Sequence, residues 1–326
     1  MTKKHKNILL TGAAGFIAAR TGEFLLERGF RVVGIDNMND YYDVRLKNYR
    51  LGRLKKNDRF SFYRLDIEDR PALSRIFKKH RFDAVLNLAA RAGVRYSLEN
   101  PHVYMTTNAG GTLNLLEQCR ANQIKKFVLA SSSSLYAGQK LPFKETLLVN
   151  TPISPYTASK KAAEEMAYVY HYLYGIDVTI LRYFTVYGPA GRPDMSPFRF
   201  IKWVAEGTPI RLFGDGSQRR DFTYVDDIAR GTVSALKRTG FKIINLGGHD
   251  AYEVRHMIRL IENRLGKKAM IECQPFQKVD MKATQADITE AHKILRWSPK
   301  ISLEEGIRRA TDWYLENRSW LSKVKV

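Results

Sequence analysis

Tyr156 and Lys160 have the types and spacing for proton chemistry in this 326-residue chain. Four residues apart near the start of an expected helix, they lie on one helix face. A phenol with a pKa of about 10 is a poor base at neutral pH, but a neighbouring ammonium lowers that pKa by stabilising the phenolate. The serine cluster Ser131–Ser134 ends an expected strand upstream, and the Ser132 hydroxyl can bridge phenolate and substrate. These residues predict a phenolate general base.

A glycine turn near the amino terminus predicts a phosphate site. Gly12 and Gly15 follow a short apolar strand and open a helix, so bare backbone can approach a pyrophosphate at the helix N-terminus. Ala18 stands at the third glycine position, where it serves close packing of helix on strand. Asp36 ends the next strand, 21 residues after Gly15, where an acid binds ribose hydroxyls and repels a 2′-phosphate. The pattern predicts NAD rather than NADP.

A third strand ends at Asp66 and Ile67, which we expect to hold the amino group and the face of adenine. Helix capping is the other reading of Asp66.

Alternating short apolar strands and helical segments must position these residues. The expected strands are Ile8–Thr11, Arg31–Ile35, Phe60–Leu65, Ala84–Leu88, Phe127–Ala130 and Val178–Leu181, and the helices include Ile17–Glu27, Pro71–Lys79, Leu113–Ala121 and Ala158–Tyr174. Continuous apolar strands joined by helices indicate a parallel sheet covered on both faces. The predicted fold class is therefore α/β, a doubly wound, Rossmann-like parallel sheet.

The pattern changes after Arg182, where Gly and Pro cluster at Gly188–Pro193. We expect residues 1–181 to form the NAD-binding domain and residues 182–326 to form mainly a smaller α/β substrate lobe. The chain should return to the first domain around residues 214–240.

Composition narrows the class of protein further. The chain has 54 Lys and Arg against 33 Asp and Glu, a net charge of +21, which suits an anionic partner or a cationic surface. The basic runs Arg50–Arg59, Lys78–Arg81 and Lys323–Lys325 are expected to be solvated and remote from the site.

Two cysteines without metal-ligand spacing indicate a reducing compartment and no metal site. No stretch approaches the ~18 apolar residues of a membrane span, so we expect a cytoplasmic protein with no membrane partner.

Longer motifs resemble a known family. Thr11–Ile17, Ser131–Tyr136 and Tyr156–Lys160 are similar to the extended short-chain dehydrogenase/reductase superfamily. The segments 34–43, 92–101 and 182–195 resemble the UDP-glucuronate 4-epimerase family within it, and 219–228 is shared more widely among nucleotide-sugar enzymes.

This resemblance implies an isomerase that uses NAD. Tyr156, with Ser132 in the relay, would take the proton of the sugar 4-hydroxyl, C4 hydride would pass to NAD, and the 4-keto sugar would turn over before hydride returns to its other face. UDP-glucuronate would become UDP-galacturonate.

The resemblance also implies two sets of binding residues. The cofactor set is Gly12, Ala14, Gly15, Phe16, Ile17, Asp36, Asn37, Asp66, Ile67, Leu88, Ala89, Ala90, Arg91, Asn108, Ser131, Tyr156, Lys160 and Tyr183. The substrate set is Arg95, Ser133, Ser134, Thr185, Arg192, Phe213, Arg220 and Asp280. Arg220 would pair with the diphosphate, and Phe213 and Asp280 would line the uridine pocket.

Four alternatives stay open. Dehydratases and decarboxylases of the superfamily need acids where this chain has Ser133 and Ser134, which argues against both reactions. Another UDP-sugar 4-epimerase, acting on UDP-galactose or an N-acetyl sugar, is disfavoured by Thr185, because most such enzymes carry Asn there. Ser133, Ser134 and Thr185 suit a C5 carboxylate, and Arg192 is a further candidate to hold it. A non-catalytic NAD-binding regulator that contacts nucleic acid would have no need of the Tyr156–Lys160 pair.

Family pattern and sequence differ at a few positions. Ala18 and Ala137 replace Gly, Arg91 stands where many relatives have Gln, and Arg296 occupies a place that is commonly Gly after a helix. If that last site needs a positive φ, arginine incurs a steric cost. The resemblance further implies a homodimer through the helices around 106–121 and 158–174, and no nucleic-acid partner.

Overall fold

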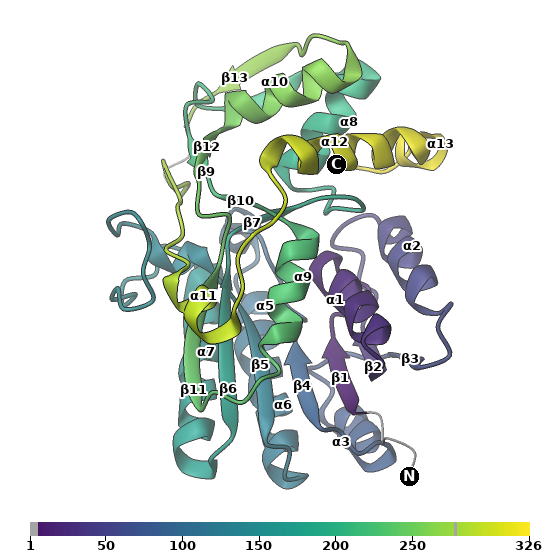
Figure 1. The fold of residues 1–326 in the computed structure, drawn as a ribbon, viewed down its shortest axis with the longest axis vertical. Helices are drawn as coiled ribbons and strands as arrows, with labels where there is room; N and C mark the ends of the chain where they lie inside the picture. The colour runs from purple at the N-terminus through teal and green to yellow at the C-terminus, as the bar shows by residue number, and fades with distance from the viewer. Residues whose placement is uncertain (1–5, 277–278) are drawn as a thin grey trace.

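The structure, a computed structural model, describes residues 6–276 and 279–326. Its centre is a seven-stranded sheet in the order β11-β6-β5-β4-β1-β2-β3, with every pair of neighbours parallel. The strands are β1 (Asn7–Thr11), β2 (Arg31–Asp36), β3 (Phe60–Arg64), β4 (Ala84–Asn87), β5 (Lys126–Ser132), β6 (Asp177–Tyr183) and β11 (Phe241–Leu246). The predicted doubly wound α/β fold is confirmed (Figure 1).

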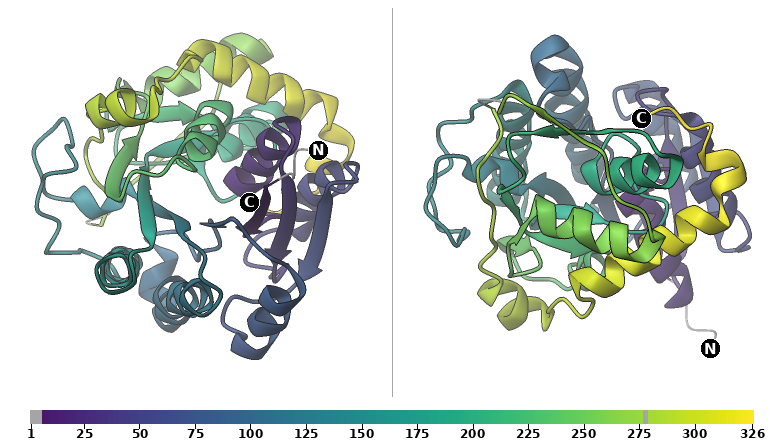
Figure 2. Two further views of the ribbon diagram at one scale, coloured as in Figure 1. Left: turned by 60° about the horizontal axis from the view of Figure 1, so that its bottom comes forward. Right: turned by 90° about the horizontal axis from the view of Figure 1, so that it is seen from above.

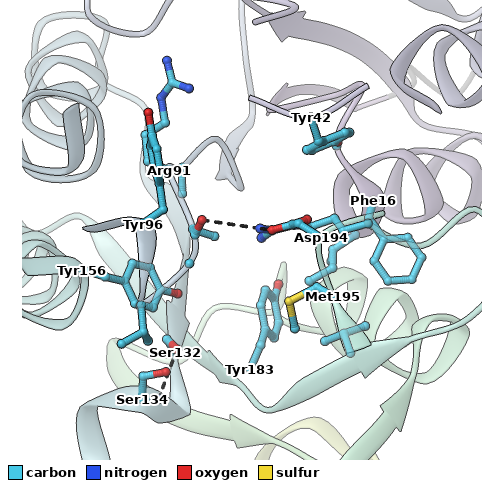
Figure 3. Close-up of a pocket in the computed structure, with 18 of the residues that line it drawn as sticks. Phe16, Tyr42, Arg91, Tyr96, Ser132, Ser134, Tyr156, Tyr183, Asp194 and Met195 are labelled. Carbon is cyan, nitrogen blue, oxygen red and sulfur yellow. Dashed lines mark hydrogen bonds and ion pairs between the residues drawn. The ribbon is translucent and has the colours of Figure 1, made fainter. Parts of the chain in front are cut away.

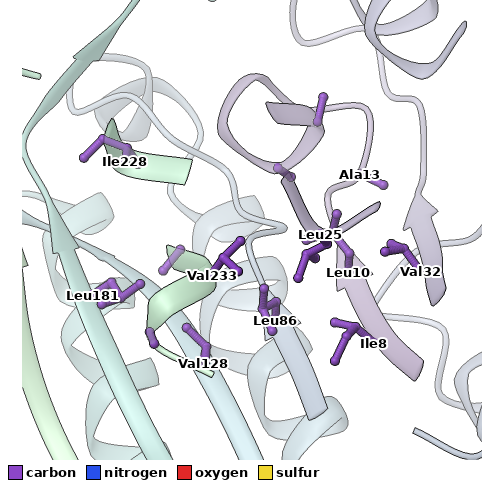
Figure 4. Packing of buried hydrophobic residues seen from close by; sticks show 14 of the residues in the cluster. Ile8, Leu10, Ala13, Leu25, Val32, Leu86, Val128, Leu181, Ile228 and Val233 are labelled. Atoms are coloured by element: carbon purple, nitrogen blue, oxygen red, sulfur yellow. The ribbon is translucent and has the colours of Figure 1, made fainter. Parts of the chain in front are cut away.

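Helices cover both faces of this sheet, as Figure 2 shows from two further directions. One layer contains α1 (Phe16–Glu27), α2 (Val44–Leu54) and α9 (Val225–Ser234), and the other contains α3 (Arg70–Lys79), α6 (Gly111–Ala121) and α7 (Pro155–Tyr174). Along β1, Ile8 and Leu10 pack into the first layer while Leu9 packs into the second, which is the period of two of a strand. Figure 4 shows Ile8 and Leu10 among the buried residues of the first layer, with Val233 of α9.

A smaller lobe lies over one end of the sheet (Figure 1). Its elements are β7 (Thr185–Tyr187), α8 (Ser196–Glu206), β8 (Ile210–Phe213), β9 (Arg219–Arg220), β10 (Phe222–Tyr224), β12 (Tyr252–Glu253), α10 (Val254–Leu265), β13 (Ile271–Gln274), α12 (Leu303–Glu316) and α13 (Arg318–Leu321). Between them the chain returns to the first unit as α9 and β11, and α11 (Thr289–Leu295) packs against β11. The returning segment therefore extends beyond residue 240 and completes the sheet.

One expectation about charge was wrong. Arg50, at the start of the run expected to be solvated, is 3% exposed. The run overlaps α2, whose residues Leu46, Arg50 and Leu54 recur at helical spacing on its buried face. A count of consecutive basic residues does not take the helical repeat into account. The repeat places Arg50 on the buried face of α2.

No helix in the two described ranges is long and apolar enough to span a membrane.

Two of the departures from the family pattern have clear conformations. Ala137 has φ −52°, so its backbone needs no glycine, and Gly138 beside it takes the positive φ of +85°. Arg296 follows α11 at φ +52° and ψ +44°, in the left-handed region. The helices α7, α8 and α10 end on glycine in that same conformation. The positive φ on which the expected steric cost at Arg296 depends is therefore present.

Replacing Arg296 by glycine should stabilise the fold. Relief of about 1–2 kcal/mol of left-handed strain exceeds the additional chain entropy of glycine, so we expect a net gain of about 0.5–1 kcal/mol in the free energy of unfolding. Urea denaturation measures it. Arg28→Gly is the matched control, because Arg28 is also an exposed residue after a helix but has φ −84°. A gain in both variants, or in neither, contradicts the strain argument.

Candidate active site

A cavity of about 760 Å³ opens at the carboxyl end of the sheet, beneath the smaller lobe. Parallel strands bring their carboxyl ends to one edge, which explains why residues from the ends of β1 to β6 meet there. Of the predicted site residues, the following line the cavity: Gly12, Gly15, Phe16, Ile17, Asp36, Asn37, Asp66, Ile67, Leu88, Ala89, Ala90, Arg91, Arg95, Ser131, Ser132, Ser133, Ser134, Tyr156, Lys160, Tyr183, Thr185, Arg192, Phe213, Arg220 and Asp280. Ala14 and Asn108 do not.

The start of α7 fixes the tyrosine. Ser154 caps this helix in a reciprocal capping box with Thr157, and Pro155 occupies the first turn. Tyr156 therefore sits in the first turn, opposite the end of β5. Figure 3 shows its ring beside Ser132, with Asp194 and Met195 across the cavity. The Ser132 hydroxyl accepts a hydrogen bond from the Ser134 backbone at 3.1 Å, which orients it.

Lys160 lies one turn further along α7 and is buried. Its Nζ donates to the backbone oxygen of Ala130 at 2.9 Å, which holds the ammonium at the end of β5. Burial lowers the pKa of Lys160 to about 8, against the opposing charge of Glu164. Burial raises the pKa of Tyr156, while contact with Ser132 and the charge of Arg192 lower it. The phenol consequently depends on nearby positive charge to act as a base.

The glycine loop has the shape of a dinucleotide cradle. Gly12 has φ +67°, and a Cβ there would meet the backbone of Ala89 at 2.9 Å. A Cβ on Gly15 would meet the oxygen of Gly12 at 2.8 Å. Arg91 adds a buried Nε without a hydrogen-bond partner in the described structure. A bare backbone wall and a free guanidinium donor fit the pyrophosphate of NAD.

Asp36 and Asp66, which the sequence analysis predicts to contact the adenosine half, both line the cavity. Asp36 accepts hydrogen bonds from the backbone N–H of Ala14 at 3.1 Å and of Met38 at 2.8 Å, and it retains lone pairs toward the cavity. Asn37 donates to Asp66 at 2.7 Å. Lys47, which the sequence analysis missed, is buried in the same wall with its Nζ 3.9 Å from Asp36.

Ala14 and Asn108 do not line the cavity, but each forms hydrogen bonds with a residue that does. The amide of Asn108 brackets the backbone of Arg91, accepting from its N–H at 2.8 Å and donating to its oxygen at 3.0 Å. Asn108 lies in the π-helical segment Met105–Gly110, a conformation common at functional sites and not readable from local sequence. Asn108 therefore positions Arg91 rather than lining the site.

Residues predicted for the uridine end gather from three distant segments. The Arg95 guanidinium lies 3.8 Å from the centre of the Phe213 ring and pairs with Asp280 at 2.5 Å. Arg220 lines the same end, and burial lowers its pKa, with Asp280 opposing the effect. Arg219 instead donates to the oxygen of Ala251 and does not line the cavity.

The cavity wall also carries hydroxyl groups and a further arginine. Ser133, Ser134 and Thr185 line the cavity, as does Arg192. Arg192 pairs with Asp194 at 2.5 Å and lies over the Tyr41 ring at 5.9 Å. Burial raises the pKa of Asp194, but the charge and hydrogen bonds of Arg192 outweigh it and leave the pKa below its usual value.

Arg199 and Gln218 were also missed. Arg199 Nε and Gln218 Oε1 line the cavity, buried and without a hydrogen-bond partner in the described structure. No local motif singles out either residue, because each reaches the cavity only through the packing of α8 and of the turn after β8. Both are further donors or acceptors for a polar ligand.

The described residues contain no cluster of three or more potential metal ligands.

Comparison with known proteins agrees with this geometry. The model of the NAD dependent epimerase/dehydratase family matches residues 8–247. The chain is 56% identical to UDP-glucuronate 4-epimerase from Thermodesulfobacterium geofontis over 98% of this chain and 99% of the relative. The UDP-glucuronic acid 4-epimerase from Bacillus cereus, solved in complex with UDP-glucuronic acid and NAD, has a TM-score of 0.91 and 39% identity over 95% of this chain and 99% of that one. UDP-glucose 4-epimerase from Thermotoga maritima has a TM-score of 0.88 and 32% identity over 96% and 99%.

A methyl group at Gly12 should disrupt the cradle. Gly12→Ala forces a Cβ against the Ala89 backbone and strains a left-handed residue, so we expect the affinity for NAD to fall by at least about tenfold. Fluorescence titration of cofactor-stripped protein measures it. Gly52→Ala is the control, because a Cβ on this α2 glycine meets nothing within 4 Å. Equal NAD affinity in both variants would refute the assignment of the loop.

Proposed function

The chain belongs to the NAD dependent epimerase/dehydratase family, and we propose that it interconverts UDP-glucuronate and UDP-galacturonate by inverting C4 of the uronic acid. The observation that carries this proposal is the meeting of Tyr156, Lys160 and Ser132 in a cavity that is also lined by the hydroxyl groups of Ser133, Ser134 and Thr185 and by Arg192. The relative with 56% identity bears the name UDP-glucuronate 4-epimerase.

The chain's own residues manage the proton. NAD, when bound, supplies a reversible hydride acceptor for C4. Tyr156, as phenolate, removes the proton of the 4-hydroxyl, with Ser132 bridging the two oxygens. Lys160 provides the positive charge that stabilises the phenolate. After the sugar ring has turned over, the same phenol returns its proton to O4, so each of these side chains regains its starting state.

The carboxylate end must prevent a side reaction. A 4-keto uronate is a β-keto acid, and it loses CO2 when its carboxylate is aligned with the ketone. Ser133, Ser134 and Thr185 donate hydrogen bonds to the carboxylate and hold it in place. Arg192 stabilises the negative charge of the carboxylate. Serine hydroxyls at 133 and 134 have no useful acidity, which separates this site from those of dehydratases and decarboxylases in the superfamily.

The UDP half occupies the other end of the cavity. Arg220 pairs with the diphosphate, since a guanidinium binds phosphate oxygens in a bidentate manner. Phe213, Asp280 and Arg95 surround the uridine. Their mutual contacts, at 3.8 Å between Arg95 and the Phe213 ring and 2.5 Å between Arg95 and Asp280, support a shared pocket.

The assembly is a homodimer through α6 and α7. Tyr168, Tyr172 and Leu173 of α7 are 47%, 75% and 58% exposed, and Leu113 of α6 is 37% exposed. Large apolar side chains at such exposure favour an interface. The protein works in the cytoplasm: its two cysteines, Cys119 buried and Cys273 exposed, are free thiols, which suits a reducing compartment.

The activity is tested with purified protein and UDP-glucuronate. UDP-galacturonate should form without net consumption of cofactor, and Tyr156→Phe should lower kcat by at least about 100-fold while NAD stays bound, because only the proton acceptor is lost. Tyr170→Phe, which removes a hydroxyl from the same helix where it faces Glu117, is the control. Chromatography with mass spectrometry separates the products.

Other outcomes of that assay identify the alternatives. Turnover of UDP-galactose without turnover of UDP-glucuronate would contradict the substrate assignment. UDP-pentose as the main product would mean decarboxylation. Full activity in Tyr156→Phe would refute the mechanism.

The alkaline side of the pH profile should report Lys160. A lysine with its pKa lowered to about 8 is charged below that pH and neutral above it, so kcat/KM should decline above about pH 8 as the phenolate loses its neighbouring charge. Lys160→Arg retains charge, and its residual activity should persist to higher pH. Rates normalised to each variant's maximum test this, and coincident alkaline limbs would contradict the role of Lys160.

A further inference from the structure

Arg50 is a buried cation outside the cavity. Its side chain is 3% exposed, and it does not line the site. Within the described residues no carboxylate pairs with it, and all four of its hydrogen-bond acceptors are neutral oxygens. Burying a charge is costly unless the charged group is well hydrogen-bonded. These four hydrogen bonds therefore offset the cost of burying the guanidinium of Arg50.

The four contacts join two loops that approach the site from different parts of the chain. Nη1 donates to the oxygen of Ala14 in the glycine loop at 3.2 Å and to the Tyr42 hydroxyl at 2.6 Å. Nε and Nη2 donate to the oxygens of Ala190 and Gly191, both at 2.9 Å. One planar guanidinium thus fixes the cofactor loop to the segment that immediately precedes Arg192.

The second of these loops needs an external restraint. Ala190 has φ +55°, an unfavourable conformation for a residue with a Cβ. Arg50 binds the carbonyl oxygen of this residue and of the next one. Strained backbone persists only where the surroundings over-determine it, and Arg50 supplies two of the bonds that do so.

The identity of the side chain also matters. A lysine at position 50 offers a compact ammonium in place of a planar group with five donors, so it cannot reach Ala14 and the Ala190–Gly191 carbonyls together. Lys47, one turn earlier on α2, is already held beside Asp36, at 3.9 Å, and burial lowers its pKa with Arg50 contributing to the decrease. It cannot replace Arg50 in the clamp.

We propose that Arg50 is a positioning residue that fixes the Arg192 loop against the cofactor loop and thereby controls which product leaves the site. The inference rests on the proposed epimerisation and on the proposed carboxylate role of Arg192. Arg50 touches neither ligand. It acts by keeping Arg192 at a constant place relative to the glycine loop.

Failure of this positioning has a defined chemical consequence. When the carboxylate of the 4-keto uronate rotates into alignment with the ketone, the C5–C6 bond breaks and its electron pair moves to form the enolate at O4. CO2 leaves, and C5 then takes a proton from water. If this ketone leaves the site, the product is a UDP-4-keto-pentose and the hydride taken from C4 would remain on the cofactor as NADH. If the hydride returns to C4 first, the product is a UDP-pentose and the cofactor would be NAD again. Either product replaces the epimer.

The test compares Arg50→Lys and Arg50→Met with the unmodified protein. We expect the ratio of decarboxylated to epimerised product to rise by about tenfold or more in Arg50→Lys, because a small misplacement remote from the reacting atoms has effects of about 10²-fold. The affinity for NAD, measured by titration of stripped protein, should fall several-fold. The product ratio is independent of how much of the variant is folded.

Lys202→Met is the matched control. Lys202 is a buried cation of α8 whose Nζ likewise binds only backbone oxygens, those of Leu321 and Ser322 at 3.0 and 2.6 Å. Its loss should lower thermal stability as the Arg50 variants do, without changing the product ratio or NAD affinity. A merely structural role for Arg50 predicts that the two sites behave alike.

The outcomes separate the two proposals. An unchanged product ratio and unchanged NAD affinity in folded Arg50→Lys would overturn the role of Arg50, as would failure of both Arg50 variants to fold. If the unmodified protein does not convert UDP-glucuronate, the proposed function fails, and the part of the inference that concerns product control fails with it. The NAD titration alone then tests whether Arg50 holds the cofactor loop in place.

Discussion

A chain of buried hydrogen bonds between β1 and α7 holds the candidate site together. Thr11, the last residue of β1, donates to Asn87 at the end of β4 at 2.7 Å, and Asn87 donates to Thr112 at 3.0 Å. Thr112 donates to the backbone of Asn108 at 2.6 Å, and the Asn108 amide donates to Ser159 of α7 at 2.9 Å. All five side chains are buried. A network of this kind is stabilising only when every member is satisfied, so the glycine loop, the Arg91 backbone and the tyrosine helix are positioned as one unit.

The charged side chains of the cavity also depend on hydrogen-bond partners. Eight basic and five acidic side chains line the cavity, a modest excess that suits a diphosphate and a uronate, while the rest of the +21 lies elsewhere. Some cations of the cavity are paired with carboxylates, as Arg95 and Arg192 are, and others are not. Among the residues that the structure describes, Arg91 and Arg199 keep a buried Nε without a hydrogen-bond partner, whereas surface arginines such as Arg308 are paired with carboxylates. Free buried donors are costly in isolation, and an anionic ligand would satisfy them.

The sequence predicted what is local and missed what depends on packing. Gly12 and Tyr156 belong to short motifs in which strand, turn and helix cap are adjacent in the chain, so the elements could be placed within a few residues. The position of Arg296 after a helix indicated a steric cost if the site needs a positive φ, and its φ is positive. Arg50 was misread, because a run of basic residues does not reveal which one faces inward. Arg199 reaches the cavity through the packing of the smaller lobe on the sheet, and no pattern in its own segment contains that contact.

The positions of Ser133 and Ser134 carry no acidic side chain, and this bears on whether the proposed 4-keto intermediate keeps its carboxylate. A superfamily site that eliminates or decarboxylates supplies an acid beside the ketone, whereas Ser133 and Ser134 supply only hydroxyls, and Asp194 is held by Arg192. The charge of Arg192 also lowers the pKa of Tyr156, so one guanidinium at the carboxylate end influences the base as well. In the proposed mechanism, reversible proton transfer at O4 needs Tyr156, while retention of CO2 needs Arg192 in place. Under the proposed mechanism, selectivity for epimerisation depends on how firmly the Arg192 loop is held to the cofactor loop, and the hydrogen bonds of Arg50 to Ala14, Ala190 and Gly191 join these two loops.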